Sequence, residues 1–204
     1  LDIMLNVRGV VLVFYILLFS VLFASSDFIL DDISSNGYKV KFLLNDDLEF
    51  NKKDSFTSIK SSKGYTDILG MPKLPLYSTM IMIDPSKEYE VDFVVEKSKV
   101  IKNIKVTPTQ NIQKGLEKTT VEIINNDFYN SFNSYPYINV SISEPMVMRN
   151  IVVCNINVVP FNYFPKENRL EIYESISINI REVGQTEDIR SRDLPKSKVF
   201  ENIY

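Results

Sequence analysis

The stretch "VVPFNYFPKENRLEIYESISINI", residues 158–180, decides the fold class. After the turn sequence at 165–168, apolar side chains return at every second residue, as on one face of a β-strand. The residues of this apolar face are Leu170, Ile172, Ile176, Ile178 and Ile180. Glu174 interrupts the face, which indicates a β-bulge or a bend between sheets. Tyr163 and Phe164 are large enough to cover the end of a core, so the stretch predicts a long hairpin with an aromatic end.

The same period of two recurs upstream. "YKVKFLL" at 38–44 and "EYEVDFVV" at 88–95 alternate apolar and charged residues, and turn sequences separate such runs. Shorter runs lie at 99–106, 119–124, 138–143 and 150–159. No capped helical pattern exceeds two turns, so we predict an all-β fold, an antiparallel β-sandwich of about eight or nine strands over 36–182. The expected core is Val40, Phe42, Val91, Phe93, Ile123, Val152, Cys154, Ile156, Ile172 and Ile178.

The segment "GMPKLP", residues 70–75, precedes the run "LYSTMIMI". Its two prolines hold the chain extended and remove two hydrogen-bond donors from any sheet ladder. We therefore expect this segment to follow a sheet edge or to cross between sheets.

Composition excludes several classes of function. The chain of 204 residues contains no histidine, which removes Ser-His-Asp and Cys-His catalysis and most zinc sites. Its net charge of −3 gives no basic field for nucleic acid. Acidic pairs at 31–32, 46–47 and Glu90 with Asp92 fall in turns or on solvated faces, which argues against glycosidase chemistry. The run 45–49 has oxygen ligands but lacks a calcium-loop pattern. We expect no enzyme activity, no cofactor and no metal.

The first 26 residues have the pattern of a secretory signal peptide. Arg8 precedes an apolar run, and Ala24 and Ser26 suit the positions before a cleavage site after Ser26. The apolar run is shorter than a membrane-spanning helix needs, which favours a cleaved signal peptide over the alternative, an uncleaved anchor. We expect no stable membrane span after cleavage. The predicted location is secreted, periplasmic or at the cell surface.

Cys154 is the single cysteine of the chain. In an exported protein an unpaired cysteine is a candidate reactive thiol. However, Cys154 shares a strand face with Val152, Ile156 and Val158, and no histidine is available to lower its pKa. We predict a core residue.

The order of several motifs resembles the N-terminal propeptide of gingipain-type cysteine peptidases. The motifs are "GMPKLP" (70–75), Tyr135 with Pro136, Arg149, "PFNYFP" (160–165), "LEIY" (170–173) and "ISINI" (176–180). The resemblance covers about residues 64 to 182. The family turn more often reads Tyr-Asn-Pro, whereas residues 162–165 spread these elements out, and the catalytic His and Cys of a peptidase domain are absent from this chain.

The resemblance implies a β-sandwich that assists folding of a downstream peptidase domain and occupies its active-site cleft until it is cleaved off. The implied partner is a gingipain-like cysteine peptidase domain, in cis or in trans. For members specific for Arg or Lys, a basic residue enters the cleft. Arg149 matches an arginine of the family pattern, and Lys114 and Lys118 are further candidates; a strand-end ion pair or solvated loop charges are the alternatives.

The tail completes the expected domain plan. Residues 1–26 form the signal peptide, 27–183 the propeptide-like sandwich, and 184–204 a linker with the start of a downstream domain. Candidate maturation cuts follow Arg190, Arg192, Lys196 and Lys198.

One further interpretation of the function stays open. A stand-alone secreted module that binds a carbohydrate or protein would share the same strand pattern, and Tyr135, Tyr137, Tyr163 and Phe164 are candidates for a flat aromatic platform. Residues 139–141 match a glycosylation sequon.

Overall fold

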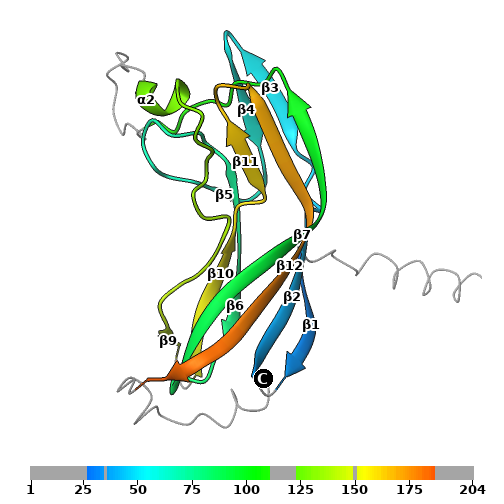
Figure 1. The fold of residues 1–204 in the computed structure, drawn as a ribbon, viewed down its shortest axis with the longest axis vertical. Helices are drawn as coiled ribbons and strands as arrows, with labels where there is room; N and C mark the ends of the chain where they lie inside the picture. The colour runs from blue at the N-terminus through cyan, green and yellow to red at the C-terminus, as the bar shows by residue number, and fades with distance from the viewer. Residues whose placement is uncertain (1–26, 35, 111–122, 149–150, 187–204) are drawn as a thin grey trace, which may run out of the picture.

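The computed structural model describes residues 27–34, 36–110, 123–148 and 151–186, which form twelve strands and one short helix (Figure 1). The strands are β1 (Phe28–Ser34), β2 (Gly37–Leu43), β3 (Glu49–Lys53), β4 (Phe56–Lys60), β5 (Gly64–Tyr65), β6 (Pro75–Met82), β7 (Lys87–Lys102), β8 (Val140–Ile142), β9 (Met146–Met148), β10 (Ile151–Val158), β11 (Phe161–Phe164) and β12 (Arg169–Gln185). The helix is α2 (Asn126–Tyr129). The strand pairs are antiparallel, so the all-β prediction is confirmed. The strand number exceeds the expected eight or nine because several strands are only two to five residues long.

The first sheet is organised around β12. Its order is β1-β2-β12-β11, and β7 pairs with the other edge of β12 along its whole length, from Arg169 opposite Lys102 to Gln185 opposite Lys87. Figure 1 shows β7 and β12 running side by side from one end of the molecule to the other. We call the end at β3, β4 and α2 the upper end, and the end at β9 and the start of β7 the lower end.

The second sheet has the order β5-β6-β10-β8, and β9 also pairs with β10. Its inner face and that of the first sheet share one buried cluster, which contains Val40, Ile178, Tyr77 and Ile156. Burial of this apolar area is the main driving force for bringing the sheets together. Seven of the ten predicted core residues are buried: Val40, Phe42, Val152, Cys154, Ile156, Ile172 and Ile178.

Three predicted core residues differ. Val91 and Phe93 pack against the core but are only partly buried, because they lie on β7 at the edge of the first sheet. Ile123 is 37% exposed, so its assignment to the core was wrong. It follows residues 111–122, which lie outside the described residues, and precedes α2 without joining any strand.

Glu174 marks a bulge in β12, as the sequence predicted. The register with β7 shifts between Tyr173 and Ser175. The extra residue directs its carboxylate to Lys97 and Lys99, each at 2.9 Å, and these partners lower the pKa of Glu174. The bulge lies between the part of β12 that pairs with β11 and the part that pairs with β2.

The hairpin of β11 and β12 closes the upper part of the first sheet. Asn168 ends its turn with φ of 47°, and its N–H donates to Pro165 O at 3.1 Å. Tyr163 is fully buried, and its burial raises its pKa to about 12. Phe164 is only partly buried, and the Arg169 guanidinium lies over it, 3.7 Å from the centre of the Phe164 ring. One of the two predicted aromatics therefore covers the core.

Irregular chain completes the upper end. The predicted strand 99–106 ends at Lys102, because Asn103 turns the chain with φ of 59°. Residues 104–109 then run beside β4 and the proline segment, with bridges from Val106 to Thr57 and from Pro108 to Pro72. The segment 70–75 crosses to the second sheet and begins β6, as its prolines suggested.

Candidate functional site

The cleft, maturation and signal-cleavage residues proposed from the sequence all lie outside the described residues. They are the cleft candidates Arg149, Lys114 and Lys118, the maturation candidates Arg190, Arg192, Lys196 and Lys198, and the signal-cleavage residue Ser26. The structure does describe the residues on either side of the first three. These flanking residues show which part of the described fold each candidate segment is joined to.

Gln110 and Ile123, the described residues on either side of 111–122, belong to a hydrogen-bonded base. The side chain of Gln110 donates to Ile123 O at 2.8 Å and accepts from Ile123 N–H at 2.9 Å. Gly70 bridges the adjacent residues: its N–H donates to Thr109 O at 2.9 Å, and its C=O accepts from Asn125 N–H at 3.1 Å. These four bonds hold the two ends of the segment side by side. We call Gly70, Thr109, Gln110, Ile123 and Asn125 the base.

Gly70 is required at the base by its backbone and by space. Its φ of +75° is a conformation that residues with a Cβ adopt only at a cost. A Cβ there would also lie 2.9 Å from Asn125 N. Gly70 of "GMPKLP" is therefore required for the backbone conformation of the base and not for pairing in a sheet.

Polar side chains fix the proline segment beside the base. Thr66 Oγ1 donates to Pro72 O at 2.9 Å and accepts from Leu74 N–H at 3.1 Å. Thr109 Oγ1 donates to Thr66 O at 3.2 Å. Sequence analysis missed Thr66, Thr109 and Gln110 because single side-chain-to-backbone bonds leave no periodic pattern.

The base continues at Asn125 into a group of aromatic residues whose rings contact one another: Phe128, Tyr129, Tyr135 and Tyr163. Asn125 caps α2 by accepting from Phe128 N–H at 3.0 Å, and Tyr129 donates its hydroxyl to Val106 O at 2.7 Å. Tyr135 exchanges two backbone hydrogen bonds with Tyr163, at 2.8 and 3.0 Å. Two motifs that carried the family resemblance, the Tyr135–Pro136 pair and the turn 160–165, are thus neighbours in space.

Large apolar side chains stay exposed near the base. Ile68 and Leu69 directly precede Gly70, and Ile123 belongs to the base itself. Phe132 and Tyr137 follow α2 and are 78% and 71% exposed. Ile68, Leu69 and Ile123 thus place exposed apolar side chains at the base, as is typical of a protein-binding surface.

Met148 and Ile151, the described residues on either side of Arg149 and Asn150, lie at the other end. Met148 of β9 pairs with Ile151 of β10, so Arg149 and Asn150 connect two paired strands. In Figure 1, β9 lies at the lower end and α2 at the upper end. The described residues that flank the two groups of cleft candidates therefore lie at opposite ends of the molecule.

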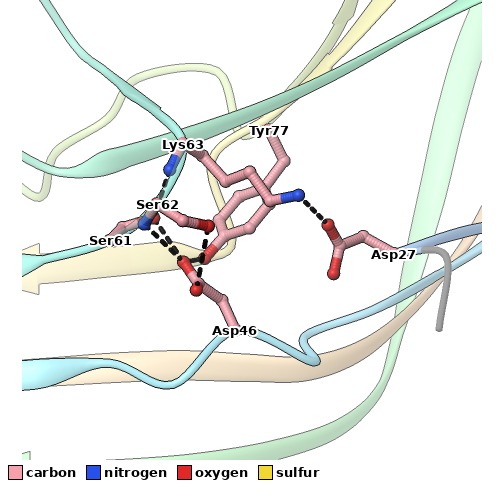
Figure 2. A network of polar contacts seen from close by, with 6 residues as sticks. All are labelled: Asp27, Asp46, Ser61, Ser62, Lys63 and Tyr77. Carbon is pink, nitrogen blue, oxygen red and sulfur yellow. Dashed lines mark hydrogen bonds and ion pairs between the residues drawn. The ribbon is translucent and has the colours of Figure 1, made fainter. Parts of the chain in front are cut away.

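A polar network joins four chain segments (Figure 2). Asp46, after β2, accepts hydrogen bonds from the Ser61 and Ser62 hydroxyls, from Ser62 N–H at 3.3 Å and from the Tyr77 hydroxyl at 3.0 Å. Lys63 forms an ion pair with Asp27 at 2.8 Å. Burial alone would raise the pKa of Asp46, but these four hydrogen bonds outweigh it and lower the pKa. The network uses Asp46 as a structural acceptor.

Other chemical candidates have structural roles. Cys154 is 1% exposed, and burial raises the pKa of its thiol to about 11, which makes it a poor nucleophile. Asp92 pairs with Arg181 and accepts from Asn179, each within 2.9 Å. Asn139 of the sequon donates to Val159 O and Phe161 O, both at 2.8 Å. In the part of the chain that the structure describes, no three metal-binding side chains gather.

The proposed aromatic platform is wrong. Tyr135 and Tyr163 are buried in the core, and Phe164 is covered by Arg169. Only Tyr137 of the four residues is fully exposed. A flat glycan-binding surface needs several exposed rings side by side.

The described residues thus form an elongated antiparallel β-domain that fixes a chain segment at one end. None of its helices is long and apolar enough to cross a membrane, as judged over the described residues. Similarity to known proteins identifies the family. The family model Propeptide_C25 matches residues 34–198, and the chain belongs to this family.

Curated relatives agree with this membership. Over 163 residues, 77% of this chain, it is 22% identical to gingipain R1 of Porphyromonas gingivalis, covering 16% of that protein. Over 164 residues, 73% of this chain, it is 23% identical to gingipain R2 of the same organism, covering 22% of that protein. The chain therefore spans less than a quarter of the length of these relatives.

Two solved structures share the fold. The complex of Porphyromonas gingivalis RgpB pro- and mature domains superposes with a TM-score of 0.70 at 19% identity, covering 88% of this chain and 95% of the matched chain. A structure on the zymogenic latency of gingipain K from the same organism has a TM-score of 0.63 at 16% identity, covering 80% and 96%.

Proposed function

We propose that this chain is the propeptide region of a secreted gingipain-like cysteine peptidase. In this role it assists folding of the peptidase domain and blocks the active-site cleft until it is removed. Membership in the Propeptide_C25 family supports the role, as does the fold shared with a propeptide that was solved together with its mature domain. The proposed role requires no chemistry from the domain itself: its thiol is buried, and Asp46 and Asp92 serve a hydrogen-bond network and an ion pair.

The observation that carries the proposal is the base of segment 111–122. A loop that inhibits a peptidase must enter the cleft at low entropic cost, and fixed ends reduce that cost. Four hydrogen bonds fix these ends, and exposed apolar side chains lie nearby to contact a partner. We therefore favour Lys114 or Lys118 as the residue that enters the cleft.

Arg149 is the competing candidate. It connects β9 and β10 at the lower end, and Met146 and Val147 of β9 are each 42% exposed. Because the two candidate regions are at opposite ends, one small cleft contacts only one of them. Substitutions therefore separate the two possibilities.

The remaining roles extend the same proposal. Residues 1–26 direct export to the periplasm, the cell surface or the medium, and 27–183 form the propeptide. Residues 184–204 link it to the peptidase, with maturation after Arg190, Arg192, Lys196 or Lys198. The partner is the peptidase domain, in cis or in trans.

The test is a titration of the chain against the mature peptidase domain from the same reading frame or genome. We expect saturable inhibition without hydrolysis by the chain itself. Lys114→Ala or Lys118→Ala should weaken inhibition by roughly 2–4 kcal/mol, as truncation of an interface anchor does. Arg149→Ala, of equal charge change, is the matched control. A peptidase rate that stays constant at saturating chain contradicts the function, whereas loss of inhibition with Arg149→Ala alone moves the contact to the lower end.

A further inference from the structure

Both sheets end along one flank of the lower end. β7 is the edge of the first sheet, and β8 and β9 form the edge of the second. Within the described ranges, β7 pairs with β12 only, so alternate residues of β7 direct N–H and C=O groups away from the sheet. A strand of 16 residues therefore presents unpaired hydrogen-bonding groups.

A cavity of about 580 Å³ lies between these two edges. Its apolar lining includes Ile83, Tyr89, Ile142 and Cys154, from both sheets. Ser143, Glu144 and Pro145, which connect β8 to β9, complete one wall. The cavity joins the β7 edge, so a chain that lies along the edge can place side chains into it.

The inner face of β7 is incompletely buried. Val91 and Phe93 stay partly exposed, whereas their partners on β12, Ile180 and Ile178, are 1% and 0% exposed. The difference arises because the sheet stops at β7. One further strand would bury these side chains in the same way.

The flank carries excess negative charge. Lys87 is already paired with Glu182 at 3.0 Å. Glu88, Glu90 and Glu144 line the cavity and form no ion pair with any described residue. An incoming chain with basic side chains would neutralise these carboxylates.

The opposite edge strand of the same sheet, β1, is less than half as long as β7, and residues 88–95 of β7 contain no extra residue of their own. β1 is seven residues long, and its register with β2 is broken between Leu30 and Asp32. Short length and a bulge discourage pairing with a further strand. Between Glu88 and Val95, β7 carries no proline and no lysine.

We propose that the free edge of β7, at residues 88–95, is extended by a strand from the mature peptidase domain. The incoming segment is extended and alternates apolar side chains, which enter the cavity, with Lys or Arg side chains, which face Glu88, Glu90 and Glu144. The source is the peptidase because the shared fold is that of a domain solved with its mature domain, and an edge of this length suits a large, stable partner. This inference rests on the proposed function and adds a second contact to it.

The experiment is amide hydrogen exchange on the whole chain, alone and bound to the mature peptidase domain with its active-site thiol alkylated. Strand addition should protect amides of residues 88–95 in the complex, because hydrogen bonding slows their exchange. In parallel, the affinity for the peptidase domain is measured for two double variants. The first is Glu88→Lys/Glu90→Lys on β7, and the second is Asp31→Lys/Asp32→Lys on β1. Both double variants reverse two exposed charges on an edge strand of the first sheet. We expect at least tenfold weaker binding for the β7 variant and less than a twofold change for the β1 control.

The outcomes separate the inference from the function. A complex that forms without protection at 88–95, and with equal affinity for the β7 variant, overturns the inference and leaves the proposed function standing. Absence of any complex overturns both. Protection at 88–95 in the isolated chain also overturns the inference: if it depends on concentration, a second copy fills the edge, and otherwise another segment of this chain does.

Discussion

The lower part of the molecule and its upper end are built by different rules. In the lower part, β2, β12 and β7 form a continuous ladder in which alternate side chains of β2 and β12 are buried and those of β7 are partly buried. At the upper end, the base depends on single hydrogen bonds from Gln110 and Gly70, with isolated bridges at Thr57 and Pro72. We infer that the ladder supplies most of the stability of the domain, whereas the irregular upper end positions a segment for recognition.

The largest expected effect tests the ladder. Ile178→Ala removes a fully buried side chain between Val40 of β2 and Phe93 of β7. Loss of transfer energy and formation of a cavity should lower the free energy of unfolding by roughly 3 kcal/mol, as urea denaturation would measure. Ser177→Ala, on the outer face of the same strand, is the control and should change stability little. A small loss for Ile178→Ala would mean that the ladder is not the stabilising part.

The next effect tests the upper end. Gly70→Ala places a Cβ at φ of +75° and 2.9 Å from Asn125 N. We expect a loss of roughly 2 kcal/mol in stability and, in the folded fraction, weaker peptidase inhibition, since the base loses its shape. Gly64→Ala is the matched control, because an added Cβ there meets only Leu76 O at 3.7 Å. Equal inhibition by both variants would show that the base does not position the inhibitory segment.

The same contrast explains what sequence analysis predicted. Alternation is a repeated signal, so it located β2, β7, β10 and β12 and the burial of Cys154. A single break in that signal was enough to predict the bulge at Glu174. Both successes belong to the ladder.

The sequence of the upper end contains a weaker pattern from which to predict its structure. Ile123 was assigned to the core because its neighbours alternate, yet its backbone bonds to the Gln110 side chain and joins no strand. The base forms through residues far apart in sequence, such as Gly70 and Asn125, and no local pattern reports such contacts. The positions of the basic candidates could be proposed from sequence, but the hydrogen bonds that fix the ends of segment 111–122 could not.

A smaller effect separates positioning from stability. Gln110→Ala removes both side-chain bonds to Ile123, but Gln110 is exposed, so water replaces much of their energy. We expect a stability loss of only about 1 kcal/mol in urea denaturation, together with a clear loss of inhibition measured by peptidase titration. Gln185→Ala, an equal truncation of an exposed glutamine at the lower end, should leave inhibition unchanged. The same inhibition constant for both variants would contradict a positioning role for Gln110.

The smallest effect tests the link between the two regions. Asp46 follows the ladder strand β2, while its donors Ser61 and Ser62 follow β4 and Tyr77 belongs to the second sheet. Its pKa is lower in the folded state than the unfolded value of about 3.9, so its stabilising contribution is present above that value and is lost as pH falls through the folded pKa. Asp46→Asn replaces one accepting oxygen by an NH₂ group and removes this dependence.

At pH 7 we expect Asp46→Asn to lower the free energy of unfolding by at most about 1 kcal/mol, because Asp46 is partly exposed and solvent weakens its hydrogen bonds. The difference from wild type should shrink when urea denaturation is repeated below pH 4, where the wild-type carboxylate becomes protonated as well. Asp47→Asn is the control, since Asp47 is exposed and forms no hydrogen bond with its side chain among the described residues. A pH-independent difference would show that the charge of Asp46 does not tie the upper end to the ladder. The two regions would then be joined only by the strands that they share.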